Sequence, residues 1–179
     1  MRVLVWGAGA IGGTMGAYLA RAGHDVTLVD NVDEHVTAIN RDGTRITGPI
    51  AEFTQRVPAF TPATISGEWD TIMLATKAHH TEAATRALLP HLSAAGCVIS
   101  VQNGLNELTI AEIVGAERTV GAFVNFGADY LEPGVILHGS RAAVVVGEID
   151  GRVTPRVTAI RDVWRDFDDR AIVTPNIWG

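Results

Sequence analysis

A segment near the amino terminus has the spacing of a phosphate-binding glycine loop. It reads Gly7-Ala8-Gly9-Ala10-Ile11-Gly12. In such a loop the first glycine permits a tight turn, the second lets a pyrophosphate approach the backbone, and the third lets a helix pack closely on the preceding strand. The amides at the start of that helix then face the phosphates. The pattern predicts a dinucleotide site, and its alternative is a strand-to-helix turn that holds no ligand.

An acidic residue follows the loop at a suitable distance. Asp30 ends the next predicted strand, about twenty residues after the loop, where a carboxylate accepts hydrogen bonds from the adenosine ribose. A 2′-phosphate would face this anion, and the next residue is Asn31 where an NADP enzyme often has arginine. The pair favours NAD, with Arg41 and Arg45 as alternative partners for a phosphate. An ordinary turn aspartate is the other interpretation.

Polar residues also follow two later apolar runs. Residues 76–80 read Thr-Lys-Ala-His-His, and residues 102–104 read Gln-Asn-Gly. Ligands of an open α/β sheet bind at the carboxyl ends of its strands, so both segments are expected beside the glycine loop. Lys77 could hydrogen-bond a substrate carboxylate or carbonyl, and the Asn103 amide could hold a cofactor ribose or a substrate oxygen. The pair suits reduction of a keto acid, and the alternative is a solvated charge beside a tight turn.

Strands and helices alternate around these residues. Short apolar runs predict strands over Val3–Trp6, Asp25–Val29, Arg45–Thr47, Thr71–Ala75, Cys97–Val101, Thr119–Phe126, Gly134–Leu137 and Ala143–Ile149. Helical spacing predicts helices over Ala10–Ala22, Glu34–Arg41 with Asp33 as its cap, Thr81–Leu92, Leu105–Val114 and Pro155–Phe167. Residues 48–67, which contain several prolines, are expected to form short strands and loops. We expect an α/β fold with a Rossmann-like, doubly wound, mostly parallel sheet and antiparallel strands near its carboxyl-terminal part.

Composition bounds the class of protein. A chain of 179 residues with 47% hydrophobic content fits one domain spanning residues 1–179. The net charge of −6 makes nucleic acid an unlikely partner and favours small molecules. Cys97 is the only cysteine, so a reducing compartment fits. The first apolar run starts almost at Met1 and no run approaches a membrane span, so we expect a cytoplasmic protein without a membrane partner.

Three motifs carry a family resemblance. They are Gly7–Gly12, the segment Trp69–Ala78 and the Gln-Asn-Gly of residues 102–104. Together they resemble the amino-terminal domain of the ketopantoate reductases over most of the chain. The resemblance implies an oxidoreductase of pantothenate biosynthesis whose glycine loop binds NADP(H), with Lys77 and Asn103 between the cofactor and 2-dehydropantoate. It also implies a cofactor contact for His80, which stands where the family commonly has glutamine, and a place near the nicotinamide for residues 125–128.

The predicted site combines both lines of reasoning. Lys77 and Asn103 are the expected catalytic residues, on the side of the substrate and the nicotinamide. The expected cofactor contacts are Gly7, Ala8, Gly9, Ala10, Ile11, Gly12, Asp30, Asn31, Lys77, His80, Asn103 and Ala128. The cofactor is NADP by resemblance, whereas Asp30 favours NAD. No metal site is expected, because adjacent His79 and His80 should diverge and nothing completes a ligand set.

The sequence also departs from the family. Family members continue into a helical domain that carries a lysine general acid and a glutamate that orders substrate, and this chain ends at residues 176–179, about where that domain begins. A truncated product of a longer gene would account for that ending. We therefore expect a chain that binds cofactor but is weak or inactive alone, since the general acid is missing. A non-catalytic NAD(P)-sensing module is the alternative, although Lys77 and Asn103 favour the enzyme.

Aromatic residues gather near the carboxyl terminus. Trp164, Phe167 and Trp178 are expected to be exposed in an isolated domain, as contacts for a second domain or a partner chain. Some self-association, such as a homodimer through these residues, is expected.

Overall fold

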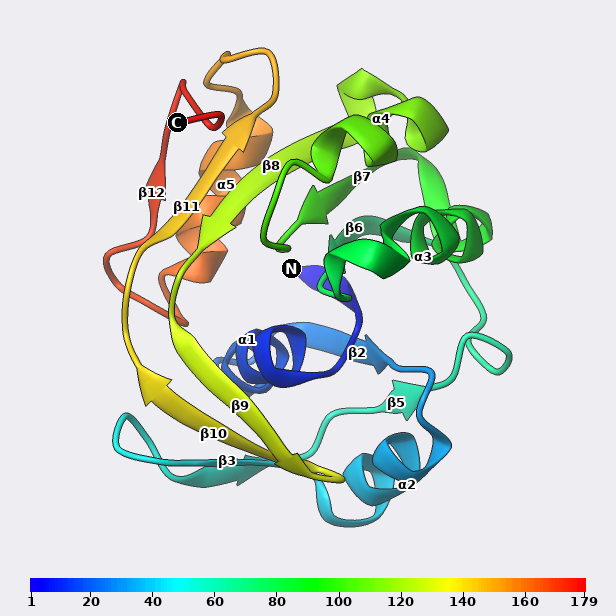
Figure 1. The fold of residues 1–179 in the computed structure, drawn as a ribbon, viewed down its shortest axis with the longest axis vertical. Coiled ribbons are helices and arrows are strands. Elements are labelled where there is room, and N and C mark those ends of the chain that lie inside the picture. Colours follow the sequence, from blue (N-terminus) through cyan, green and yellow to red (C-terminus); the bar gives the residue numbers. More distant parts are fainter.

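The computed structural model describes residues 1–179, and its main feature is an eight-stranded sheet with the order β12-β11-β8-β7-β6-β1-β2-β5 (Figure 1). The strands of this sheet are β1 (Arg2–Trp6), β2 (Asp25–Val29), β5 (Ala59–Phe60), β6 (Trp69–Leu74), β7 (Leu92–Ser100), β8 (Thr119–Val124), β11 (Val144–Glu148) and β12 (Ile172–Val173). From β5 to β8 all neighbours are parallel, and β11 pairs antiparallel with β8. The predicted fold class is confirmed.

Helices cover both faces of this sheet. They are α1 (Ala10–Arg21), α2 (Asp33–Asp42), α3 (Thr81–Leu88), α4 (Glu107–Val114) and α5 (Pro155–Trp164), with short 3₁₀ turns η1 (Ala78–His80), η2 (Leu89–His91) and η3 (Ala116–Arg118). Successive residues of a strand point to opposite faces. Thus Val3 and Val5 join a core cluster with residues of α1 and α5, whereas Leu4 and Trp6 join another with residues of α3 and α4. Burial on both faces explains the unbroken apolar runs.

A second sheet packs against α1. It has the order β4-β3-β10-β9 and comprises β3 (Thr44–Thr47), β4 (Phe53–Gln55), β9 (Gly127–Glu132) and β10 (Val135–Ser140). Its core contact joins Ala17 of α1 to Ile46 and Ile136, which are fully buried. The expectation that all late strands extend the main sheet was wrong for β10, and β9 was not predicted at all. Figure 1 shows β9 and β10 beneath α1, with the chain leading from the end of β10 up into β11.

Several element ends differ from prediction. Asp33 is the first residue of α2 and does not cap it, because the position before the helix is Val32 and no side chain caps it. The third helix ends at Leu88 instead of Leu92, since Pro90 lies in the 3₁₀ turn that follows and has no N–H to continue a helix. The strand after it therefore starts earlier, at Leu92.

The carboxyl-terminal aromatics behave differently from one another. Trp164 is 2% exposed and Phe167 is 6% exposed, because α5 packs on the main sheet, so the expectation that both are exposed was wrong. Trp178 is 43% exposed, and its indole N–H donates to the Ile149 carbonyl (2.8 Å). Cys97 is buried, and burial raises the pKa of its thiol to about 11. None of the helices has the length and apolarity that crossing a membrane requires.

Candidate functional site

The three glycines of the loop have different surroundings. Gly7 has a φ of +104°, and a Cβ there would lie 2.8 Å from the backbone of Ala75 and Thr76, at the end of β6. A Cβ on Gly12 would overlap the Gly7 carbonyl oxygen. Around Gly9 nothing lies within 4 Å of an added Cβ, and its φ of −69° is open to any residue. The fold therefore requires glycine at positions 7 and 12. At position 9 it does not, and the absence of a side chain there only leaves free space beside the loop.

Asp30 holds the loop from the end of β2. Its Oδ2 accepts from the Ala8 N–H (2.9 Å) and its Oδ1 from the Val32 N–H (3.1 Å). Two lone pairs of the carboxylate remain for a ligand, since each oxygen can accept twice. The first amides of a helix have no intrahelical partner, and no side chain caps the start of α1, so these amides are available to an anion.

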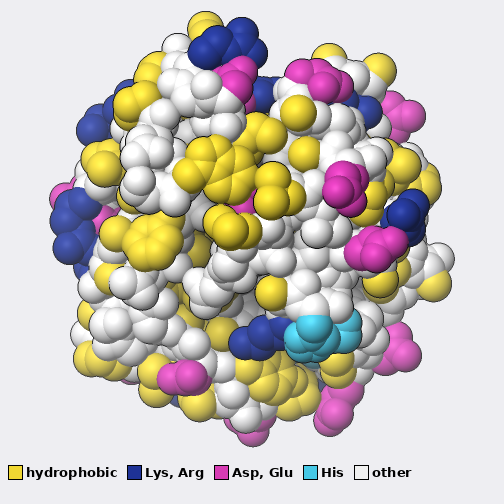
Figure 2. Space-filling view, turned by 45° about the horizontal axis from the view of Figure 1, so that its top comes forward, with side chains coloured by type: hydrophobic (Ala, Val, Ile, Leu, Met, Phe, Trp, Pro, Cys, Tyr) yellow, Lys and Arg dark blue, Asp and Glu magenta, His cyan; other side chains and the backbone are white.

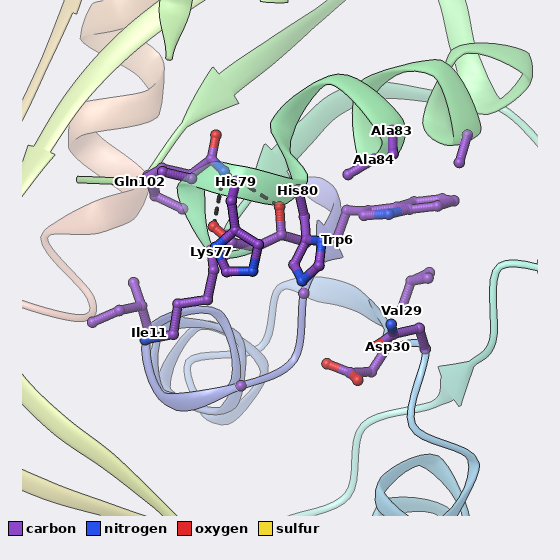
Figure 3. A pocket seen from close by; sticks show the side chains of 18 of the residues that line it. Trp6, Ile11, Val29, Asp30, Lys77, His79, His80, Ala83, Ala84 and Gln102 are labelled. Carbon is purple, nitrogen blue, oxygen red and sulfur yellow. Dashed lines mark hydrogen bonds between the residues drawn. The ribbon is translucent and has the colours of Figure 1, made fainter. Parts of the chain in front are cut away.

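A cavity of about 670 Å³ opens at this edge of the sheet, a volume within the range of small-ligand sites. β1 lies between β2 and β6, where the winding of the sheet reverses, and ligands of such folds bind there. One wall is an apolar slot made by Trp6, Val29, Pro62, Ala83, Ala84 and Ala87. In Figure 3, Lys77, His79 and His80 occupy the centre of the opening, and the Asp30 carboxylate points into it from the end of β2.

Gln102 joins the two polar segments that follow β6 and β7. It is buried, and its side-chain amide donates to the Thr76 carbonyl (2.8 Å) and to the Thr81 hydroxyl (3.0 Å). The Thr81 hydroxyl lies 3.1 Å from the Asn106 amide oxygen, a second link between the segments. These bonds fix the distance between the Lys77 and Asn103 loops, so the two side chains line one cavity.

The His79 and His80 rings lie at the cavity mouth and contact each other. Their centroids are 4.0 Å apart in η1, so the expectation that they diverge was wrong. No group of three or more His, Cys, Asp or Glu side chains is placed to hold a metal ion. Figure 2 shows histidines next to a Lys or Arg side chain, with apolar side chains gathered elsewhere on the same face. Lys77 is the only lysine of the chain and is exposed.

A second cavity of about 350 Å³ lies against the other side of the glycine loop. Its walls come from the loop, from β9, from the end of β2 and α2, and from Lys77, and they comprise Gly9, Ala10, Asp30, Val32, His35, Lys77, Ala128, Asp129 and Tyr130. The small sheet thus reaches the site through β9. No apolar run marks β9, which is mostly exposed, and its contribution was missed apart from Ala128.

Most predicted site residues meet at these cavities. The larger cavity is lined by Gly7, Gly9, Ala10, Ile11, Asp30, Asn31, Lys77, His80 and Asn103. Ala128 lines only the smaller one, while Ala8 and Gly12 line neither. Trp6 and the alanines of α3 were not predicted, and Gln102 was expected beside the loop without a role of its own. The signal for Trp6 was its position directly before the loop, and that for Ala83 and Ala87 was their helical spacing beside Lys77.

The parallel strand order, the glycine turn and the uncapped start of α1 define a Rossmann-like α/β protein. The family model described as "Ketopantoate reductase PanE/ApbA" matches residues 3–151. The chain belongs to the ketopantoate reductase family, and the resemblance drawn from its motifs is confirmed.

Individual relatives agree with this assignment. The 2-dehydropantoate 2-reductase of Pyrococcus abyssi is 34% identical over 183 residues, which cover 99% of this chain and 57% of that protein. The enzyme of the same name from Halobacterium salinarum is 33% identical over 89% of this chain and 53% of its own length. The chain spans a little over half the length of these curated relatives.

Solved structures show the same fold. The 2-dehydropantoate 2-reductase of Geobacter metallireducens GS-15 superposes with a TM-score of 0.89 at 27% identity, over 98% of this chain and 58% of that one. A D-mandelate dehydrogenase solved with NADH and anilino(oxo)acetate superposes with a TM-score of 0.88 at 23% identity, over 99% of this chain and 58% of that one. The second likeness concerns the fold alone.

Proposed function

We propose that this chain is the cofactor-binding part of an NAD(P)H-dependent oxidoreductase that reduces a 2-keto acid, such as 2-dehydropantoate, to the 2-hydroxy acid. The observation that carries the proposal is the cavity of about 670 Å³ at the switch point of the sheet, floored by the glycine loop and lined by Asp30, Lys77 and Asn103. The open space beside Gly9 and the uncapped start of α1 suit a pyrophosphate. The apolar slot beside Trp6 suits an adenine ring.

Asp30 supports NADH as the preferred cofactor. Its two spare lone pairs suit ribose hydroxyls, and its negative charge opposes a 2′-phosphate. Asn31 beside it offers no positive charge. His80 and Asn103, which line the same cavity, are proposed as further contacts of the cofactor, and Ala128 as a contact from the second cavity.

The chemistry assigned to Lys77 and Asn103 is charge stabilisation. A bound reduced nicotinamide would supply a hydride to the ketone carbon, and negative charge would develop on the ketone oxygen. The Lys77 ammonium and the Asn103 amide can donate hydrogen bonds to a carboxylate or to that oxygen. The resemblance implies a general acid in a further domain of the family, so we propose that these 179 residues bind cofactor but turn it over slowly alone.

The test is a titration of the chain with NADH and NADPH, followed by quenching of its tryptophans. Gly9→Val should abolish binding by filling the open space beside the loop, and should leave the melting temperature nearly unchanged, because no protein atom lies within 4 Å of an added Cβ. Ala95→Val is the control, since Ala95 is an exposed residue of β7 that does not line the cavity. Equal affinity in the parent and in Gly9→Val would refute the proposed site. Binding by a longer form without turnover of any 2-keto acid would favour a sensing module.

A further inference from the structure

His35 of α2 is a buried histidine whose two ring nitrogens are both hydrogen-bonded. It is 1% exposed. Its Nε2 lies 2.9 Å from the Ala8 carbonyl oxygen, and its Nδ1 lies 3.0 Å from the Gly134 amide nitrogen. An amide N–H can only donate and a carbonyl can only accept, so Nδ1 must be free of a proton and Nε2 must carry one. Only this neutral tautomer satisfies both partners.

Asp30 and His35 together hold both backbone groups of Ala8, its N–H and its carbonyl. Asp30 accepts from the Ala8 N–H (2.9 Å), and His35 donates to the Ala8 carbonyl. The Ala8 carbonyl and the Gly9 N–H belong to one planar trans peptide, in which the two groups point in opposite directions. Holding the carbonyl toward the buried His35 therefore turns the Gly9 N–H away from it.

The other partner of His35 belongs to the turn between β9 and β10. Gly134 has a φ of +79°, and an added Cβ would lie 3.3 Å from Ala38 of α2. The Gly134 carbonyl accepts from the Arg45 N–H of β3 (2.8 Å). The Tyr130 ring of β9 packs edge-on against His35, with centroids 5.1 Å apart. One side chain thus connects the glycine loop to the small sheet.

We propose that His35 is a positioning residue of the dinucleotide site, which aims the Gly9 amide at the pyrophosphate and ties the β9–β10 turn to the loop. The inference rests on the proposed function, because it requires a pyrophosphate at the glycine loop. His35 itself need not touch the ligand's phosphates, since it acts through the Ala8 carbonyl.

The test compares two ligands and three variants. ADP-ribose contains the pyrophosphate, whereas adenosine lacks it. In His35→Phe the dissociation constant of ADP-ribose should rise about three- to tenfold, as expected for the loss of one hydrogen bond, while that of adenosine changes less than about twofold. His35→Gln should lose less, because its amide can still donate to the Ala8 carbonyl. His24→Phe is the control, since His24 bonds the amino terminus and Asp166 and lines neither cavity.

The outcomes separate this inference from the function on which it rests. If the parent chain binds no ADP-ribose, the proposed function fails. Suppose that the parent binds ADP-ribose. If a folded His35→Phe binds ADP-ribose equally well, or if its affinities for ADP-ribose and adenosine fall by the same factor, only the role of His35 fails. Should His35→Phe not fold, His35→Gln and the ¹⁵N spectrum of the parent decide. That spectrum should show His35 with a proton on Nε2 alone, and a proton on Nδ1 would overturn the assignment.

Discussion

Replacing Asp30 by asparagine should exchange the cofactor preference of the site. The change removes the negative charge while keeping the size of the side chain. Two unit charges about 4 Å apart interact by about 4 kcal/mol at an effective dielectric constant of 20, and by about 1 kcal/mol in water. Asp30 is half-buried at an open cavity, so the relief for a 2′-phosphate lies between these limits. NADPH affinity should therefore rise at least about fivefold.

Asp30→Asn should also destabilise the fold, because Asp30 accepts two backbone hydrogen bonds. Asp30 accepts from the Ala8 N–H and the Val32 N–H through different oxygens. Asparagine has one oxygen, so one backbone donor is left facing an NH₂ group, at a cost of about 1–3 kcal/mol in the free energy of unfolding. NADH affinity should fall about tenfold, because the ribose hydroxyls lose a charged acceptor.

Parallel calorimetric titrations with NADH and NADPH, together with urea denaturation, measure all three effects. Asp33→Asn is the matched control, because Asp33 is exposed at the start of α2 and lines neither cavity. It should leave both affinities within about twofold. An unchanged NADPH-to-NADH ratio in Asp30→Asn, or the same shift in Asp33→Asn, would refute the assignment of Asp30 to the ribose.

Three further predictions concern stability. Trp164→Ala should lower the free energy of unfolding by about 3–5 kcal/mol in urea, because the indole is 2% exposed in the main core cluster, and an unchanged midpoint would contradict that packing. Burial raises the pKa of Glu107 above 4.5, so its ionised form disfavours folding. Glu107→Gln should raise the melting temperature at pH 7 by a margin that shrinks as the pH falls toward 4.5, and a margin independent of pH would count against this cause. Burial, aided by Arg141, lowers the pKa of His138 below 6.5. The unfolded chain then takes up the proton first, so stability falls as the pH drops below 6.5, and a His138→Phe profile parallel to the parent would refute this.

Local patterns predicted the elements whose causes are local. The strand Asp25–Val29 agrees at both ends with β2, and the start of α1 at Ala10 was also correct. The strand follows from an apolar run buried on two faces, and the start of the helix follows from the glycine turn that precedes it. The parallel neighbourhood of β6 and β7 then brings Lys77 and Asn103 to one edge, as the order of strands in the chain suggested.

The small sheet depends on contacts that the sequence does not display. Its central pair joins β3 to β10 in parallel, so Ile46 pairs with Ile136 across a long stretch of chain. β9 is mostly exposed and has no alternating pattern to mark it as a strand. The burial of Trp164 similarly depends on the main sheet extending to β11, which lies beneath α5. These features arise from tertiary packing, and periodicity within one segment cannot reveal them.

The three glycines of the loop differ in whether they are evidence for the fold or for a bound ligand. Gly7 is required by its positive φ and by the end of β6, and Gly12 by the Gly7 carbonyl oxygen. An unliganded turn of the same shape would need both, so they support the fold and leave the ligand open. Gly9 has an ordinary φ and free space around it, so nothing in the fold demands a glycine there. A glycine that the fold does not need, at the uncapped start of a helix and on the floor of a cavity, is explained by a group that must approach its backbone closely. Within the glycine motif, Gly9 is therefore the residue that adds to the evidence of the cavity for a bound dinucleotide, and the valine variant tests that residue alone.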